Sequence, residues 1–153
     1  MTESEVIRIL AENKEHRRKL FSEYDPVTGV GSPIERIRFN LTKDKYILLP
    51  KYVTDAEVFQ DILKHDSLED YIVSNNLNRE DVLDSFLRIR IKYDFEYWAA
   101  TCATIFDKLT GKEVKFKLRK AQRKLLKVLV DTLFQNRPIR IILLKARQWG
   151  GST

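Results

Sequence analysis

The stretch from Leu143 to Thr153 reads LLKARQWGGST and decides how the C-terminal third of the chain is interpreted. A phosphate-binding P-loop follows a strand and has the pattern G-x-x-x-x-G-K-[ST]. If Gly150 is the second glycine and Ser152 the hydroxyl residue, Gly151 stands in the lysine position and Lys145 in that of the first glycine. The stretch therefore departs from the strict pattern at two positions, and its context has to show whether it indicates nucleotide binding.

The residues before this stretch form a continuous apolar run. Ile139–Leu144 reads IRIILL and follows Pro138. A β-branched run of this kind is typical of a strand that is buried on both faces, as in a parallel sheet. We therefore expect a strand that leads directly into the loop, which is the context that a P-loop requires.

Such a loop has chemistry of its own. Its backbone N–H groups form an anion-binding nest, which the next helix completes. Ser152 would coordinate Mg²⁺, and Lys145 could reach the phosphates from the other end of the loop because its side chain is long. Arg147 is a second candidate cation. The alternative is that the terminal GGST is a disordered tail or an engineered linker scar.

The segment ILLKARQWGGST also resembles the start of the ATPase domain in the large subunit of tailed-phage terminases, the motors that package viral DNA. Members of this family often carry an RQ-x-G loop, and some place the lysine at the first position of the loop. The residues that match or complete this version are Lys145, Arg147, Gln148, Gly150, Gly151, Ser152 and Thr153.

Two upstream segments share the resemblance, which covers roughly residues 87–153. LRKAQRKLL resembles the adenine-recognising element of these proteins, with Gln122 as its glutamine. A glutamine amide can donate to and accept from the adenine edge at once. RIRIKYDFEYWAATCATIFDK resembles the segment that precedes this element. The loop is the most specific part, and Gln122 alone is a weak signal.

The resemblance implies an N-terminal fragment of a longer protein that ends at the Walker A-like loop. The complete protein would use ATP and Mg²⁺, with Ser152 as a metal ligand, and would add a nuclease domain. Its partners would be double-stranded DNA, the terminase small subunit at the N-terminal region, and the portal of the procapsid. It would act in the cytoplasm of a bacterial host, encoded by a phage or prophage. The 153-residue chain is expected not to hydrolyse ATP by itself.

Charge divides the chain into two regions. Residues 108–153 carry 13 Lys/Arg and 2 Asp/Glu, whereas residues 1–107 carry 15 and 20, so the net charges are +11 and −5. We expect an acidic, mostly helical N-terminal region over 1–107 and the basic start of an incomplete P-loop α/β ATPase domain over 108–153. The basic region favours a polyanionic partner.

The best helix pattern in the chain begins at Arg119 and ends near Gln135. Its inward positions are predicted to be Ala121, Leu125, Val128, Leu129, Thr132 and Leu133. Its polar side would contact DNA phosphates through Arg119, Lys120, Arg123, Lys124 and Lys127. The alternative is a solvated helix face, which any amphipathic helix must have.

The N-terminal region shows helix starts and one hairpin. The pairs Thr2/Glu5, Thr54/Glu57 and Ser67/Asp70 are capping patterns, and Asn78 opens a further helix. IRFNL and YILL flank TKDK and predict a short hairpin. In DFEYWAATCATIFD, over residues 94–107, the apolar spacing is helical. We therefore expect Trp98 to anchor the core and Cys102 to be a buried thiol. The fold class is mainly α with a small hairpin.

Other kinds of site and location have little support. His16 and His65 lack companions at ligand spacing, so a metal site is not expected. No apolar run approaches the roughly 20 residues that cross a bilayer, and MTESEVIRIL has no signal-peptide anatomy, so we expect a soluble protein that does not bind membranes. Two other functions stay open: a helical module that binds protein or DNA without nucleotide, and another P-loop ATPase such as a helicase.

Overall fold

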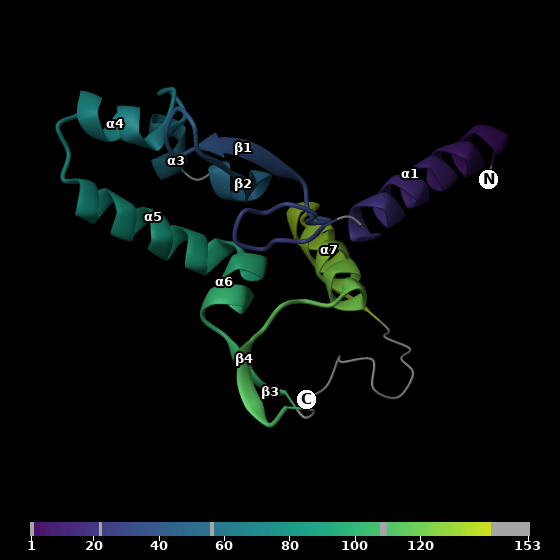
Figure 1. Cartoon of the computed structure of the whole chain (residues 1–153). Coiled ribbons are helices and arrows are strands. Elements are labelled where there is room, and N and C mark those ends of the chain that lie inside the picture. Colours follow the sequence, from purple (N-terminus) through teal and green to yellow (C-terminus); the bar gives the residue numbers. More distant parts are fainter. Residues whose placement is uncertain (1, 22, 56, 108–109, 142–153) are drawn as a thin grey trace. The chain divides into compact units, whose positions relative to one another are not determined.

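The computed structural model describes residues 2–21, 23–55, 57–107 and 110–141 (Figure 1). Within these residues the fold is mixed α/β, with seven helices and two separate two-stranded antiparallel sheets. By packing, the chain divides into two units. The larger comprises residues 25–30 and 35–118, and the smaller comprises residues 1–24, 31–34 and 119–153.

The larger unit contains nine of these elements. They are β1 (Arg36–Asn40), β2 (Tyr46–Pro50), α2 (Lys51–Thr54), α3 (Glu57–Ile62), α4 (Leu68–Ser74), α5 (Arg79–Tyr93), α6 (Phe95–Thr101), β3 (Thr104–Asp107) and β4 (Lys112–Lys115). The smaller unit contains α1 (Glu3–Phe21), which contacts α7 (Lys120–Phe134). The predicted boundary at 107/108 falls between β3 and β4, because charge and packing divide the chain differently.

The β1–β2 hairpin confirms the one predicted from the sequence. Its register runs from the pair Arg36–Pro50 to the pair Asn40–Tyr46. The backbone N–H of Leu41 donates to the Lys45 carbonyl at 2.8 Å and closes the turn. Phe39 of β1 is buried, as are Ile47 and Leu49 of β2. One face of the hairpin therefore packs against the core.

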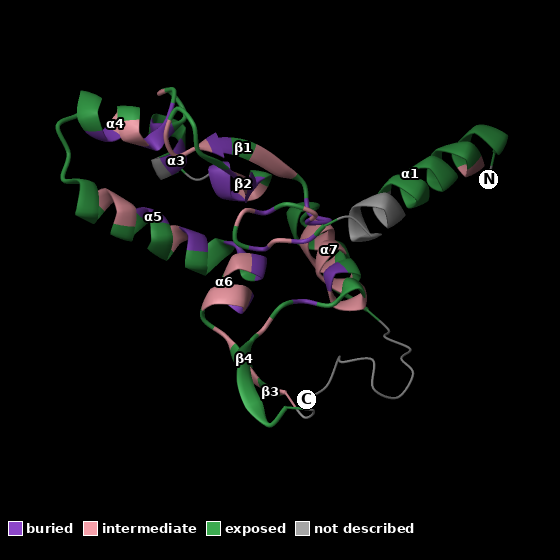
Figure 2. Cartoon of the chain, viewed as in Figure 1, coloured by how far each residue is buried: buried purple, intermediate pink, exposed green. Residues whose placement is uncertain are grey.

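The core of the larger unit lies between this hairpin and the helices that follow it. Phe39 stacks on Phe86 of α5 with 5.3 Å between ring centroids, and Phe59 of α3 meets both rings edge-on. Aliphatic side chains surround the three rings: Ile47, Leu49, Val53, Ile62, Leu68 and Ile72. Figure 2 shows these buried residues on β1, β2 and the neighbouring helices. The core thus joins the hairpin to α3, α4 and α5.

Helix caps confirm three of the four predicted starts; at the fourth, the Thr54 hydroxyl donates to the Lys51 carbonyl at 2.6 Å instead of capping α3. The Ser67 hydroxyl accepts from the backbone N–H of Asp70 at 3.1 Å, and the Asn78 side chain accepts from that of Glu80 at 2.9 Å. The capping box of α1 is present in both directions between Thr2 and Glu5. Each bond satisfies a backbone donor that the first turn of a helix leaves without an intrahelical partner.

The single helix predicted over residues 94–107 is wrong in its second half. α6 ends at Thr101, and β3 pairs with β4, so that Ile105 lies opposite Val114. Ile105 and Phe106 therefore belong to a hairpin strand and not to the helix. Gly111, at φ +66°, permits the turn of this hairpin. Trp98 is 37% exposed and is not a core anchor, and Cys102 is exposed rather than buried.

The loop after Tyr24 is held against β2. The backbone N–H of Leu48 donates to the Thr28 carbonyl at 2.8 Å. Gly29 has φ +82°, and a Cβ there would lie 2.2 Å from the Leu48 carbonyl oxygen. Only glycine fits this close approach. Hydrogen bonds from Thr28 and the Val27 backbone lower the pKa of Asp25, which starts the loop.

In the smaller unit, the basic helix is confirmed as α7. Ala121, Leu125, Leu129 and Thr132 are half-buried as expected, whereas Val128 and Leu133 are exposed. After α7, residues 139–141 of the predicted strand are irregular and exposed. The rest of that strand, 142–144, lies outside the described residues, so the start of a P-loop sheet stays a prediction.

Candidate functional site

The predicted nucleotide-binding loop lies outside the part of the chain that the structure describes. This applies to Lys145, Arg147, Gln148, Gly150, Gly151, Ser152 and Thr153. Their assignment to ATP and Mg²⁺ stays a prediction from sequence. Three features of the described residues bear on function: the start of α7, an arginine–carboxylate cluster, and an apolar pocket.

Gln122, the predicted adenine reader, lies in the first turn of α7. Its side-chain amide oxygen accepts a hydrogen bond from the backbone N–H of Arg119 at 2.9 Å. This is the contact that a glutamine or glutamate three residues into a helix makes in a capping box. Gln122 therefore also caps α7, a structural role that its residue type alone did not predict.

Part of the side of α7 that was predicted to bind DNA is an exposed basic surface. Arg119, Lys120 and Lys124 are exposed, with Lys120 and Lys124 one turn apart on the same side of the helix. Lys127 continues this stripe but is half-buried, and its Nζ lies 2.6 Å from Asp131. The exposed cations thus gather toward the N-terminus of α7. Their contact with DNA stays a prediction.

Arg123 does not belong to this surface, so its predicted exposure on the polar side is wrong. It is 3% exposed. Its Nη1 donates to the Gly31 carbonyl at 2.9 Å, and its guanidinium lies 3.9 Å from the centre of the Tyr24 ring. Arg123 is buried because it fixes the segment 31–34, whose Ile34 is also buried, to α7.

An arginine–carboxylate cluster lies inside the larger unit, where sequence reasoning predicted none. Arg36 of β1 donates to both oxygens of Asp94 at 2.8 and 2.9 Å and to Glu96 at 2.8 Å. Arg90 of α5 adds a second cation, 3.7 Å from Asp94, and its guanidinium covers the ring of Tyr97. Two arginines thus face two carboxylates.

The electrostatics of this cluster follow from its burial. Burial alone would lower the pKa of Arg36, but hydrogen bonds and charge from Asp94 and Glu96 outweigh it and raise that pKa. Burial lowers the pKa of Arg90. For Tyr52, burial first and the Asp94 charge second raise the pKa to about 12. Because the opposed charges compensate one another, the cluster serves to hold β1 against the α5–α6 junction.

A sequence signal for this cluster existed but was incomplete. Asp94 and Glu96 interrupt the run YDFEYW, and Arg36 interrupts IERIRF. A charge inside an apolar run indicates a buried partner. Nothing in the spacing says which arginine meets which carboxylate, since that depends on how α5 packs on the hairpin.

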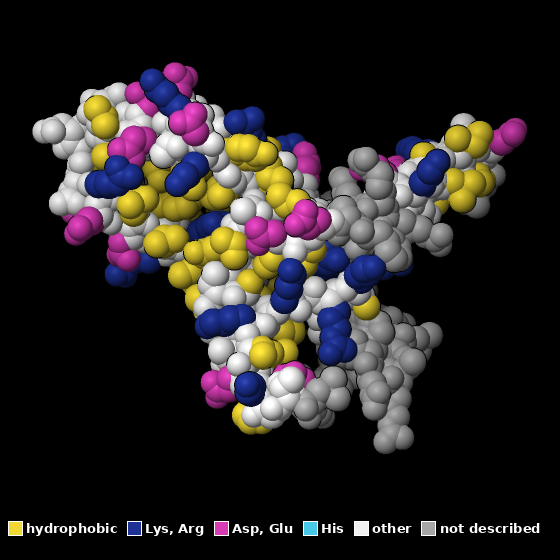
Figure 3. Space-filling view, viewed as in Figure 1, with side chains coloured by type: hydrophobic (Ala, Val, Ile, Leu, Met, Phe, Trp, Pro, Cys, Tyr) yellow, Lys and Arg dark blue, Asp and Glu magenta, His cyan; other side chains and the backbone are white. Residues whose placement is uncertain are grey.

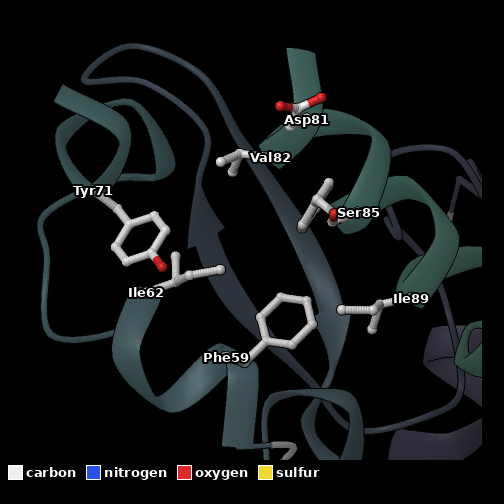
Figure 4. Close-up of a pocket in the computed structure, with 8 residues that line it drawn as sticks. Phe59, Ile62, Tyr71, Asp81, Val82, Ser85 and Ile89 are labelled. Carbon is white, nitrogen blue, oxygen red and sulfur yellow. The ribbon is translucent and has the colours of Figure 1, made fainter. Parts of the chain in front are cut away.

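The third feature is an apolar pocket of about 250 Å³ between α3, α4 and α5 (Figure 4). Its apolar lining is Phe59, Ile62, Val82, Phe86 and Ile89. Three polar residues also line it: Tyr71, Asp81 and Ser85. In Figure 4 side chains of the three helices, among them Phe59, Tyr71 and Ile89, lie around a common space, and the Asp81 carboxylate lies at its upper edge. No sequence motif marked it, because its walls come from separate segments.

Metal and membrane sites can be addressed within the described residues. There, no three His, Cys, Asp or Glu side chains form a group that could hold a metal ion. His65 instead lies 3.3 Å from Asp70 and edge-on to the ring of Tyr71. In the same part of the chain, no helix has both the length and the apolar composition to cross a bilayer.

Comparisons with models of protein families, with curated proteins and with solved structures find no match to this chain.

Proposed function

We propose that the chain forms the N-terminal part of a terminase large subunit, an ATP-driven motor that packages double-stranded viral DNA. The observation that carries this assignment is the sequence of the loop Lys145–Thr153, with its lysine first and two glycines before Ser152. Lys145 would neutralise the nucleotide phosphates with help from Arg147, Ser152 would bind Mg²⁺, and Gln122 would contact adenine. Nuclease activity and binding to the small subunit and portal belong to the complete protein.

The basic start of α7 supports a role next to DNA. Arg119, Lys120 and Lys124 are exposed there, and the first turn of α7 carries no acidic residue. Positive side chains and the N-terminal end of a helix dipole attract phosphates together. This surface has no aromatic platform or recognition helix, so it would bind the DNA backbone rather than read bases.

The first test concerns nucleotide hydrolysis. The reading frame that contains this chain should encode, after Thr153, an apolar strand that ends in Asp-Glu. In the protein with the complete ATPase domain, Lys145→Ala should abolish ATP hydrolysis. Lys112→Ala on β4, an exposed lysine elsewhere, is the matched control and should leave turnover unchanged. Turnover that survives Lys145→Ala, or a frame without such a strand, contradicts the assignment.

The second test concerns DNA and uses the 153-residue chain. Its affinity for duplex DNA should fall as salt rises, independently of sequence. The double change Lys120→Glu/Lys124→Glu should lower the slope of log affinity against log salt by about 1.8, since two phosphate contacts are lost. Lys43→Glu/Lys45→Glu in the β1–β2 turn is the control. Absence of binding at low salt would remove the DNA role of α7.

A second candidate function is a protein-interaction module that binds no nucleotide. The pocket between α3, α4 and α5 favours it, because apolar anchor side chains at protein interfaces bind in pockets of this kind. The two functions differ in one measurement: the interaction module would keep its partner when Lys145 is replaced and would never bind ATP.

A further inference from the structure

The pocket between α3, α4 and α5 has polar groups that the described chain does not use. Tyr71, Ser85 and Asp81 are among its lining residues, and their side-chain hydroxyl and carboxylate groups have no hydrogen-bond or ion-pair partner in the described residues. The remaining walls are aromatic and aliphatic. A ligand for this site must therefore be apolar in its body and polar where it meets Asp81.

The charge around the pocket specifies the sign of that polar part. From Leu68 to Ser85, which spans α4 and the first half of α5, the chain has five carboxylates and one arginine, a net charge of −4. The single arginine, Arg79, is paired with Glu69. In contrast, Asp81 is an exposed residue at the edge of the pocket, and its carboxylate forms no ion pair with a described residue. The complementary group is a cation.

The size of the pocket favours a single side chain over a larger ligand. Its volume is about 250 Å³, below the roughly 300–1,000 Å³ of pockets that enclose drug-sized molecules. One large aliphatic or aromatic side chain fits this space, and such anchors carry most of the binding energy at protein interfaces. Figure 3 shows further hydrophobic side chains between α4 and α5, surrounded by charged ones. A single anchor would thus sit within an apolar face that has a charged rim.

From this geometry we propose that the pocket docks a basic segment of a partner protein. The segment inserts one large apolar side chain among Phe59, Ile62 and Phe86 and sets a lysine or arginine against Asp81. Tyr71 and Ser85 donate hydrogen bonds to its backbone. This docking site uses neither the loop 145–153 nor α7. A test of the docking site is therefore independent of the terminase assignment.

The experiment selects the partner chemistry without assuming it. Random peptides displayed on a surface are enriched on the 153-residue chain and counter-selected on Ser85→Leu, which fills the pocket from the exposed side of α5. We expect enriched peptides to share a large apolar residue with a lysine or arginine within one helical turn. No enrichment over Ser85→Leu, or a motif without basic residues, overturns the proposal.

A second measurement tests the charge and the size of the ligand. An enriched peptide is titrated by calorimetry against the native chain, Asp81→Asn and the control Asp84→Asn. Asp84 lies one helical turn after Asp81, is not a lining residue of the pocket, and pairs with Arg88. Asp81→Asn should weaken binding about two- to fivefold, the weight of a partly exposed ion pair, and Asp84→Asn less. Equal effects of the two changes contradict the role of Asp81. Free 2-phenylethylamine that binds as tightly as the peptide makes the pocket a small-molecule site and overturns protein docking.

Discussion

Arg36 and Asp94 form a two-pronged ion pair inside the larger unit although 58 residues separate them in the sequence. Both side chains are almost fully buried, at 4% and 1% exposure. Asp94 also accepts from the backbone N–H of Tyr97 and so caps α6. One carboxylate therefore fixes the strand β1, the end of α5 and the start of α6 together.

Removing the arginine from this pair should destabilise the protein strongly. Arg36→Met removes the cation that Asp94 and Glu96 share and leaves only the more distant Arg90 beside Asp94, and breaking a buried pair in this way costs about 3–5 kcal/mol of unfolding free energy. Lys51→Met is the control, because the pair Lys51–Glu35 is exposed and its loss should cost less than about 1 kcal/mol. Urea denaturation measures both. Similar losses of unfolding free energy in the two variants would show that the buried pair stabilises the fold no more than the exposed pair does.

The glycine that lets the loop 25–30 approach β2 should not tolerate a side chain. Gly29→Ala places a Cβ 2.2 Å from the Leu48 carbonyl oxygen at a positive φ. Gly111→Ala also has a positive φ but meets nothing within 4 Å, so it carries only the conformational cost of about 1–2 kcal/mol. Thermal unfolding should show a clearly larger loss for Gly29→Ala. A loss no larger than that of Gly111→Ala would mean that the loop moves away from β2 at little cost.

Arg123 and Lys124 are neighbours with opposite expected effects. Arg123→Met removes the bond to Gly31 and the contact with Tyr24, which should cost about 2 kcal/mol of stability. Lys124→Met should change stability by less than about 0.5 kcal/mol and should instead weaken binding to duplex DNA. Chemical denaturation and a DNA-binding assay on both variants separate the two roles. If Arg123→Met is as stable as the native chain but loses DNA binding, Arg123 contacts DNA and its structural role is contradicted.

Tyr52 should make stability depend on pH in the alkaline range. Its pKa rises from 10 to about 12 in the fold, because burial and the nearby Asp94 disfavour the phenolate. The unfolded chain then releases this proton first, so the stabilising contribution is complete below pH 10 and is lost as the pH rises through 12. Tyr52→Phe removes this contribution, although it also removes the bond to the Tyr93 carbonyl. Tyrosinate absorbance should show one late-titrating tyrosine fewer in the variant; an unchanged titration curve would contradict the assignment.

Gln122 offers a separation of capping from nucleotide recognition. Gln122→Glu keeps an acceptor for the Arg119 backbone N–H, so the 153-residue chain should unfold at the same urea concentration as the native chain. The carboxylate cannot donate to adenine, so ATP affinity of the complete protein should fall if Gln122 reads the base. Gln122→Ala should lose both the helix cap, which lowers the unfolding free energy by about 1 kcal/mol, and the contact with adenine. Unchanged ATP affinity in Gln122→Glu would leave this residue with its capping role alone.

Local signals predicted the parts of the fold that local chemistry determines. Ser67 and Asn78 mark helix starts because their side chains bond to the next turn, and TKDK marks a hairpin because two apolar segments flank it. The helix α7 follows from a strong apolar period. These features depend on residues within a few positions of one another, so the order of residues is enough to find them.

Long-range features were missed for the opposite reason. The exposure of Trp98, the burial of Arg123 and the pair Arg36–Asp94 depend on which segments meet in space. Arg123 stands among exposed cations on a basic helix, and only the position of residues 31–34 makes it a buried one. The pocket has the same origin, because Phe59, Tyr71 and Ser85 come from three helices. No spacing within one helix could reveal it.

Cys102 is the only cysteine in the chain, and it is exposed at the C-terminal end of α6. A single accessible thiol can be modified with one maleimide fluorophore or spin label, without any substitution. The label would sit between α6 and the β3–β4 hairpin, away from the start of α7 in the sequence. The same accessibility lets two molecules join through an intermolecular disulfide under oxidising conditions, so a reducing agent keeps the sample uniform until the label is attached.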